Sequence, residues 1–188
     1  MEGKLIIFSA PSGSGKTTIV RELLKHYPQF EFSISATSRA PRGVEQNGVD
    51  YYFLTQEEFA AKVATDSFVE WEEVYAGTCY GTLKSEMERI WSKGNVIIFD
   101  VDVMGGISLK RIFGDKACSI FIMPPSIEEL QKRLEGRGTD AAEVIAKRVA
   151  KAGKEIERAP EFDHVVINDD LQKAIADTCA IIDNFIAQ

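Results

Sequence analysis

Cysteine and histidine are both scarce in this 188-residue chain. The three cysteines, Cys79, Cys118 and Cys179, are far apart and form no Cys-x-x-Cys pair, so we expect neither a disulfide framework nor a zinc site. The two histidines, His26 and His164, have no evident partner, and the sequence indicates no Ser/His/Asp or Cys/His nucleophile system.

Long apolar runs are also missing. The first apolar run, residues 5–8, is too short and has the wrong flanks for a signal peptide. No stretch approaches the ~18 apolar residues of a membrane span. We therefore expect a cytoplasmic protein with no membrane partner.

Positive charge is in deficit, since 22 Lys and Arg residues face 29 Asp and Glu residues, for a formal net charge of −7. Proteins that bind nucleic acid carry a strongly basic face, so no nucleic-acid partner is expected. A small anionic ligand stays compatible, because a few local arginines and backbone N–H groups can hold one. The length fits one domain with an ample core.

Apolar segments alternate with helical patterns along most of the chain. The predicted strands share a composition rich in apolar and β-branched residues: 5–9, 30–34, 96–100, 119–123 and 164–167. The predicted helices lie between or after these strands. One covers about residues 16–27, a second follows Ser126 with its capping-box partner Glu129, a third covers about residues 141–158, and the last runs from about residue 171 to the end. This alternation predicts an α/β fold with a parallel sheet flanked by helices.

The alternation is interrupted between about residues 35 and 91. The expected strands there, 51–54, 68–74 and 80–83, are short and half-exposed, and Thr55 with Glu58 forms a capping box before a short helix. The pattern predicts a small antiparallel subdomain inserted into the parallel core, a natural place for a substrate site.

Residues 10–17, Ala-Pro-Ser-Gly-Ser-Gly-Lys-Thr, follow a predicted strand and open a predicted helix. That context is typical of a P-loop, whose glycines let backbone N–H groups point at phosphate oxygens. A Gly- and Ser-rich turn is the alternative. Lys16 is expected to reach the β and γ phosphates, and Thr17 to offer its hydroxyl to Mg²⁺. The predicted ATP-binding residues here are Ala10, Pro11, Ser12, Gly13, Ser14, Gly15, Lys16, Thr17 and Thr18.

Asp100 ends the apolar segment 96–100. A carboxylate at that point suits a Walker-B-type acid held near Mg²⁺ through water. Because an aspartate at a strand end is often only a cap or turn residue, this prediction depends on the P-loop.

Arg39 and Arg42 lie on a loop rigidified by Pro41, where they could form a fork around one phosphate group with the Tyr51 hydroxyl beside them. From two arginines alone, a solvated basic loop is the favoured interpretation. From residue 37, however, the sequence runs Thr-Ser-Arg, two residues, Arg, two residues, Glu, two residues, Gly, two residues, Tyr, one residue, Phe.

This string closely resembles the guanylate kinase family. The resemblance covers essentially the whole chain from about residue 4 and continues in further segments: 68–71, 80–82, 100–102, 133–139 and 167–171. It implies a P-loop nucleoside monophosphate kinase that transfers the γ-phosphoryl of MgATP to GMP, giving ADP and GDP, in purine nucleotide metabolism and GMP recycling.

The resemblance also implies a GMP site. Its phosphate contacts would be Arg39, Arg42, Tyr51 and Tyr80, its base contacts would be Ser35, Glu70, Thr82 and Asp102, and Glu45 belongs to the same predicted set. The chemistry agrees, because guanine presents two adjacent donors, N1–H and the 2-amino group, to one carboxylate such as Glu70. Adenine would leave that carboxylate unpaired.

Three arginines, Arg133, Arg137 and Arg148, lie around Gly136 and Gly138 and match the family's lid. We expect them to close over ATP and reach the transferring phosphoryl; a solvated helix end is the alternative. For Asn168 and Asp169, at the end of a predicted strand, an adenine-side contact and a helix cap by the aspartate are equal alternatives. No protein base is needed, since a phosphate monoester with a second pKa of ~6 is largely ionised at neutral pH. Lys16, Mg²⁺ and the lid arginines are expected to supply catalysis.

One domain is predicted over residues 1–188. Its core covers about 1–34, 92–135 and 159–188, its GMP-binding subdomain about 35–91, and its lid about 136–158. Two rival functions stay open: a P-loop kinase for AMP, UMP or a ribose phosphate, and a guanylate-kinase-like protein-binding module. Glu70 with Asp102 argues against the first, and the intact Lys16 and Thr17 argue against the second. The sequence leaves the oligomeric state open.

Overall fold

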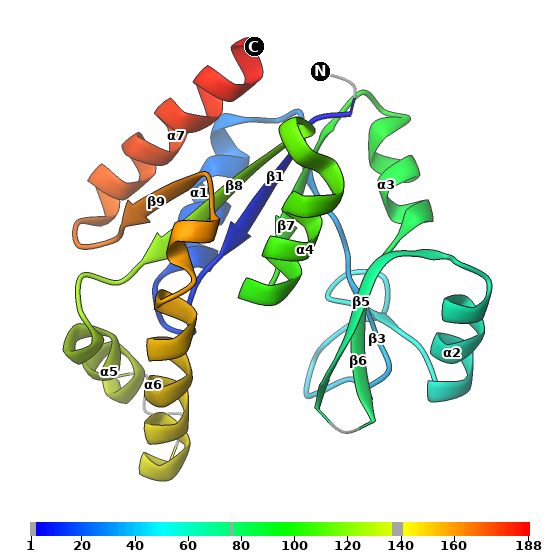
Figure 1. Ribbon diagram of the computed structural model, residues 1–188, viewed down its shortest axis with the longest axis horizontal. Coiled ribbons are helices and arrows are strands. Elements are labelled where there is room, and N and C mark those ends of the chain that lie inside the picture. The colour runs from blue at the N-terminus through cyan, green and yellow to red at the C-terminus, as the bar shows by residue number, and fades with distance from the viewer. Residues whose placement is uncertain (1–2, 76, 137–140) are drawn as a thin grey trace.

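The computed structural model describes residues 3–75, 77–136 and 141–188 (Figure 1). A five-stranded sheet with the order β2-β7-β1-β8-β9 forms its centre, and every neighbouring pair in it is parallel. Its strands are β1 (Leu5–Ser9), β2 (Phe30–Phe32), β7 (Val96–Asp100), β8 (Ala117–Met123) and β9 (His164–Ile167).

Helices cover both faces of this sheet, because side chains alternate along each buried strand. Ile6 and Phe8 of β1 pack into a cluster with the helices α1 (Lys16–His26) and α7 (Leu171–Ala187). Leu5 and Ile7 pack on the opposite face, against α3 (Lys84–Trp91) and α4 (Val103–Phe113). Among the described residues, no helix has the length and apolar composition needed to cross a bilayer.

The inserted segment forms a second, four-stranded sheet with the order β4-β3-β6-β5. Its strands are β3 (Ala36–Thr37), β4 (Tyr52–Phe53), β5 (Phe68–Tyr75) and β6 (Thr78–Leu83), and the helix α2 (Gln56–Ala64) covers it through the buried Phe59. The capping box of Thr55 and Glu58 is present at the start of α2, as predicted.

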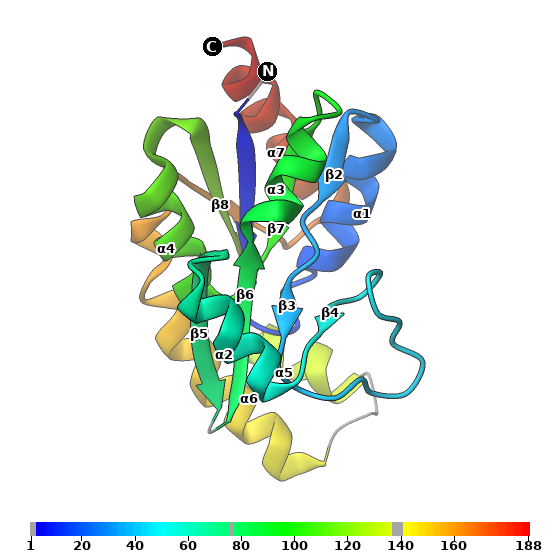
Figure 2. The ribbon, with the colours of Figure 1, turned by 90° about the vertical axis from the view of Figure 1, so that its right-hand side faces the viewer.

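Two more helices follow β8 and complete the architecture. The helices α5 (Ile127–Gly136) and α6 (Ala142–Ile156) pack on each other through Leu134 and Ile145. Figure 1 shows this pair on one side and the small sheet on the other, both beyond the carboxyl ends of β1, β7 and β8. Figure 2 shows the small sheet and α2 below the central sheet, with α6 behind them. Two short 3₁₀ turns, η1 (Gly114–Lys116) and η2 (Ala159–Glu161), lead into β8 and β9.

The α/β fold is confirmed, and β1, β7 and β9 have the predicted bounds. Other details differ. Strand β2 ends at Phe32, because only residues 30–32 pair with β7, and β8 begins at Ala117 because that residue pairs with Leu5. The small sheet is antiparallel at β3–β6 and β5–β6, whereas β3 and β4 run parallel.

The sequence patterns did not predict α3 and α4. Helix α3 begins directly where β6 ends, and its N-cap residue, Leu83, makes no side-chain capping bond. Helix α4 contains the weak helix formers Gly105 and Gly106, although its N-cap Asp102 accepts a hydrogen bond from the Gly105 N–H at 2.7 Å. Packing explains Gly106: a Cβ there would overlap the Ser9 Oγ and lie 3.1 Å from Phe162 Cε1.

Gly106→Ala should therefore destabilise the protein although alanine is the better helix former. We expect overpacking to lower the free energy of unfolding by about 1–3 kcal/mol. Gly153 in α6 is the matched control, because a Cβ there would meet nothing within 4 Å. Gly153→Ala should raise the free energy of unfolding by about 0.5–1 kcal/mol. Denaturant unfolding of both variants checks this, and equal stabilisation by the two would contradict the close packing at Gly106.

Candidate active site

The loop between β1 and α1 has the curled backbone of a P-loop. Gly13 and Gly15 have φ values of +97° and +88°, a left-handed conformation that favours glycine. A Cβ on Gly13 would lie 3.0 Å from Leu134 Cδ2 of α5, and one on Gly15 would overlap the Asn168 Nδ2. The loop therefore tolerates side chains at neither position.

A pocket of about 420 Å³, called here the P-loop pocket, opens over this backbone. All nine residues predicted for ATP binding in the loop, 10–18, line it. The predicted contact Asn168 lies behind the loop instead, 5% exposed, and its Nδ2 donates to the Ser14 carbonyl at 2.7 Å. Its position fixes the loop's curvature.

Lys16 is held at the floor of the P-loop pocket by the end of β7. Its Nζ contacts the Asp100 carboxylate and donates to the Val101 carbonyl at 3.1 Å. Thr17, at the start of α1, is exposed to the same pocket. The pocket thus presents the Lys16 ammonium group, the Thr17 hydroxyl and the Asp100 carboxylate close to a nest of backbone amides.

A second pocket of about 240 Å³, called the Glu70 pocket, lies between the small sheet and the ends of β7 and α4. Five of the residues predicted for GMP line it: Ser35, Tyr51, Glu70, Tyr80 and Asp102. The structure thus brings together residues that are far apart in the sequence. Thr82 lies fully buried behind this pocket and donates its hydroxyl to Glu70 Oε1 at 2.8 Å.

Burial and like charge shape the electrostatics of the Glu70 pocket. Burial raises the pKa of Glu70, and the nearby Asp102 carboxylate raises it further, while the Thr82 hydroxyl opposes the shift. Glu72, two residues along the same face of β5, also lines the pocket, and burial followed by Asp102 raises its pKa as well. The lining of the pocket therefore carries two carboxyl groups whose pKa values are raised.

Arg39 sits beside the Glu70 pocket in a polar and aromatic cluster. Its guanidinium donates to both Glu45 oxygens, at 2.7 and 2.8 Å, and its Nε donates to the Tyr80 hydroxyl at 3.1 Å. It also lies 4.9 Å from the centroid of the Tyr51 ring. The Arg39 guanidinium, followed by the Arg42 backbone N–H, lowers the pKa of Glu45 to about 2. Arg39 is therefore pre-oriented next to two predicted phosphate contacts.

The other predicted arginines occupy different surroundings. Arg42 is exposed, and its backbone N–H donates to Glu45 at 2.8 Å. Arg133 of α5 donates to the Asn168 carbonyl at 3.0 Å, behind the P-loop. Arg148 of α6 donates to the Ser12 Oγ at 3.4 Å and so reaches the loop itself. Arg137 lies outside the described residues.

Sequence analysis missed Glu72, Lys151 and Glu155. Lys151 follows Arg148 by one helical turn on α6, so that their shared helix face was the available signal. Its Nζ lies 3.4 Å from Glu155 Oε1, and burial raises the pKa of Glu155. Which way that helix face points depends on tertiary packing, which the sequence pattern does not give.

The two pockets share a wall. Both are lined by Tyr51, Asp100, Val101, Asp102 and Lys151. Lys151 is the cation among these five shared residues. A group that leaves a ligand in the P-loop pocket would meet a ligand in the Glu70 pocket at this wall.

Comparison with known proteins agrees with this geometry. A family profile described as guanylate kinase matches residues 2–185. A guanylate kinase of Bacteroides thetaiotaomicron is 55% identical over 186 residues, covering 99% of this chain and 91% of that protein. One of Porphyromonas gingivalis is 55% identical over 186 residues, covering 98% of this chain and 99% of that protein.

A solved structure of a guanylate kinase from Anaplasma phagocytophilum has a TM-score of 0.75 to this chain at 29% identity, covering 97% of this chain and 85% of that one. The resemblance found in the sequence is thereby confirmed. The chain belongs to the guanylate kinase family, the ATP:GMP phosphotransferases among the nucleoside monophosphate kinases.

Proposed function

We propose that this member of the guanylate kinase family binds ATP in the P-loop pocket and GMP in the Glu70 pocket, and transfers the γ-phosphoryl across their shared wall. The shared wall is the observation that carries the proposal. Two pockets of different chemistry, one rich in backbone amides and one rich in carboxylates, meet at the same five residues. An in-line transfer requires that arrangement of donor and acceptor.

Guanine recognition is assigned to Glu70, supported by Thr82 and Asp102. The ionised Glu70 carboxylate would accept hydrogen bonds from the guanine N1–H and 2-amino group. Thr82 orients Glu70 through its 2.8 Å hydrogen bond, while Ser35 and Asp102 line the same pocket. An adenine base would offer this buried carboxylate neither hydrogen bond and leave Thr82 as its partner, which is costly.

The GMP phosphate is assigned to Arg39, with Tyr51 and Tyr80 beside it and Arg42 on the same loop. The bond from Arg39 to the Tyr80 hydroxyl and its stacking on the Tyr51 ring support this assignment. In this structure Glu45 occupies the bidentate face of Arg39. A phosphate that approaches Arg39 would compete with Glu45 or share the guanidinium with it.

Mg²⁺ is the cofactor that this site would hold with ATP. The donor atoms of the site fit this ion. Thr17 supplies a hydroxyl and Asp100 a carboxylate, and both residues line the P-loop pocket. Such a sparse set of oxygen ligands suits Mg²⁺, which keeps several waters and takes its other ligands from phosphates. When bound, the ion neutralises phosphate charge. Asp100 would then exchange its present contact with Lys16 for a role near the metal.

The remaining cations would stabilise the phosphoryl group in transit. Lys16 is assigned to the β and γ phosphates of ATP, and Arg148 to the same side of the cleft because it already contacts Ser12. We add Lys151, the cation of the shared wall, to these groups. Arg133 supports the loop through Asn168. Arg137 keeps the lid role that the family resemblance implies. No protein base is required, because the attacking phosphate oxygen is already ionised.

The proposed binding of ATP and GMP also divides the chain into functional parts. Residues of about 35–91 would form the GMP-binding unit and about 136–158 the lid, on a core of about 1–34, 92–135 and 159–188. ATP and GMP are the small-molecule partners proposed. All three cysteines are free thiols, in keeping with a reducing cytoplasm.

The activity is tested with MgATP and a panel of acceptors, GMP, AMP, UMP, CMP and dTMP, by following ADP release. We expect rapid turnover with GMP alone. Lys16→Ala should lose the activity while its circular dichroism stays native, because the phosphates lose their main ammonium contact. Turnover with another acceptor would overturn the assignment of Glu70, and near-normal activity of Lys16→Ala would overturn that of the P-loop.

The raised pKa of Glu70 predicts a pH-dependent affinity for GMP. As the pH falls through that raised pKa, Glu70 gains a proton and can no longer accept both guanine hydrogen bonds. The Kd for GMP should therefore rise on acidification at a pH above 4.5, the ordinary value for a glutamate. Glu70→Gln should raise the Kd at neutral pH about 10- to 100-fold and should lose this acid dependence.

Calorimetric titration with GMP between pH 4.5 and 8 measures both effects. The ionisation of the GMP phosphate is common to all variants, so the ratio of Kd values isolates Glu70. Glu73→Gln is the matched control, since it lies on the other face of β5 and outside the lining of the Glu70 pocket. Parallel pH profiles for Glu70→Gln and the unchanged protein would refute the assignment.

Lys151→Gln should lower kcat with GMP about 10- to 100-fold, the size expected for one lost charge-assisted contact. Lys154→Gln removes the same charge from the next turn of α6 and lies outside the lining of both pockets. Steady-state kinetics of the two variants distinguish a local contact from a general charge effect. If both variants have the same kcat, Lys151 does not act on the phosphoryl group.

A further inference from the structure

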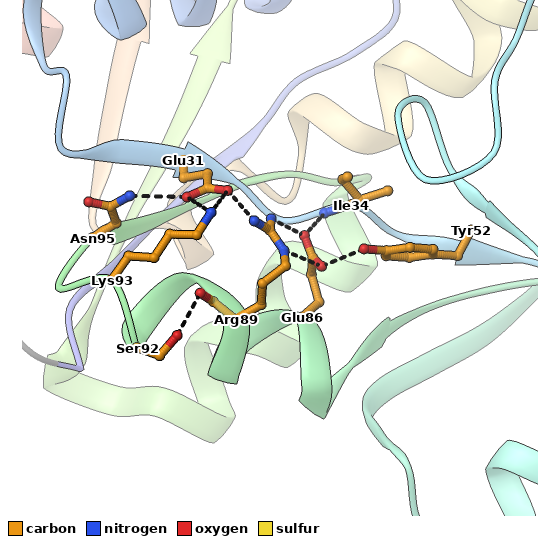
Figure 3. Close-up of polar contacts among 8 residues, drawn as sticks. All are labelled: Glu31, Ile34, Tyr52, Glu86, Arg89, Ser92, Lys93 and Asn95. Carbon is orange, nitrogen blue, oxygen red and sulfur yellow. Dashed lines mark hydrogen bonds and ion pairs between the residues drawn. The ribbon is translucent and has the colours of Figure 1, made fainter.

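A buried carboxylate lies at the junction of the two sheets, outside both pockets. Glu86, in the first turn of α3, is 2% exposed. Figure 3 shows it pointing at Arg89, at the backbone of Ile34 and at the ring hydroxyl of Tyr52. These partners come from three segments of the chain: α3 itself, the connection that follows β2, and β4.

Every acceptor position of the Glu86 carboxylate is used. Oε1 accepts from the Ile34 N–H at 3.0 Å and from Arg89 Nη2 at 2.7 Å. Oε2 accepts from the Tyr52 hydroxyl at 2.8 Å and from Arg89 Nε at 2.9 Å. Burial alone would raise the pKa of Glu86, but these hydrogen bonds lower it below its ordinary value. Glu86 therefore stays ionised and fixed.

Arg89 anchors this arrangement to the central sheet. Its Nη1 contacts the Glu31 carboxylate of β2, the edge strand. Glu31 also accepts from Lys93 Nζ, at 2.9 and 3.1 Å, and from Asn95 Nδ2 at 3.0 Å (Figure 3). The position of Glu86 is thus determined by the core, through α3 and β2 together.

Two partners of Glu86, one in the connection that follows β2 and one in β4, are next to pocket residues. Ile34 precedes Ser35, and Tyr52 follows Tyr51; both Ser35 and Tyr51 line the Glu70 pocket. The Tyr52 N–H also donates to the Ser35 carbonyl at 2.9 Å, so these two segments are tied to each other. The Ser33 N–H, bonded to the Ile98 carbonyl at 2.9 Å, makes the last contact with the central sheet before the chain crosses over.

We propose that Glu86 is a positioning residue for the acceptor nucleotide. Glu86 connects the two places where the chain passes between the core and the small sheet: residues 33–35, where it leaves the core, and residues 83–84, where it returns. In this way Glu86 holds Ser35 and Tyr51 in the lining of the Glu70 pocket. This role rests on the proposed use of the Glu70 pocket for GMP. It serves GMP binding more than ATP binding, because Ser35 lines the Glu70 pocket alone, whereas Tyr51 lines both pockets.

Tyr52→Phe is the cleanest test, because it removes one hydroxyl and keeps the ring. Tyr27→Phe is its matched control: the Tyr27 hydroxyl donates to Asp183 Oδ1 at 2.7 Å, the same phenol–carboxylate bond, at a place that lines neither pocket. We expect similar losses of Tm in both variants. Only Tyr52→Phe should raise the KM for GMP, about 2- to 10-fold for one hydrogen bond, with a smaller change in the KM for ATP.

Glu86→Gln extends the test, since it removes the charge that holds Arg89 and should raise the KM for GMP at least as much. The double variant Tyr52→Phe/Glu86→Gln should add little to the larger single effect, because both act through one network. A KM for GMP that is equal in the Tyr52 and Tyr27 variants, or a KM for ATP that rises equally, would overturn the proposal. Failure of the unsubstituted protein to use GMP would instead overturn the proposed function.

Discussion

The close packing behind the phosphate loop is the constraint on which the site depends. Gly13 is pressed against Leu130 and Leu134 of α5, and Gly15 against Asn168 at the end of β9. The loop's curvature is therefore set from outside, by a helix and a strand that come far later in the sequence. Because α5 is also the packing partner of α6, the same contacts place the helix that carries Arg148 and Lys151 over the cleft.

Charge pairing is the second organising feature. The chain is acidic overall, yet its substrates are anions, and several cations near the pockets are already paired with carboxylates. Lys16 contacts Asp100, Arg39 contacts Glu45, and Lys151 contacts Glu155. Such pairs keep the cations oriented without a ligand. A phosphate bound as we propose would exchange one anionic partner of these cations for another, so that no unpaired cation would have to be desolvated.

Local patterns predicted much of this structure. The strands β1, β7 and β9 were predicted with their observed bounds. For β1 and β7 the reason is burial, because a strand covered on both faces is mostly apolar, whereas β9 is a largely exposed edge strand of β-branched residues. The P-loop was found because its residues are contiguous. Helix α4 was missed because it contains two weak helix formers, Gly105 and Gly106, and the packing of Gly106 against Ser9 and Phe162 cannot be seen in the sequence. Helix α3 was missed because no capping side chain marks its start.

The residues of the candidate site were likewise predicted only in part. Family resemblance grouped Ser35, Glu70 and Asp102, and the structure brings them to one pocket, although their roles stay predictions. Lys151 could not be found from the pattern, since its helix repeats lysine at several positions and only packing selects the one that faces the cleft. The hydrogen-bond network around Glu86 was not predicted for a similar reason, because its members lie on three separate segments of the chain.

Strand β6 ends at Leu83 and helix α3 begins at Lys84, so the chain returns to the core with no connecting residue. Leu83 is packed in the small sheet's core, and Met87, one turn later, in that of the central sheet. Residues 78–91 therefore act as a continuous rod with its two ends embedded in different cores. A tilt of the small sheet relative to the central sheet would therefore have to turn α3 with it.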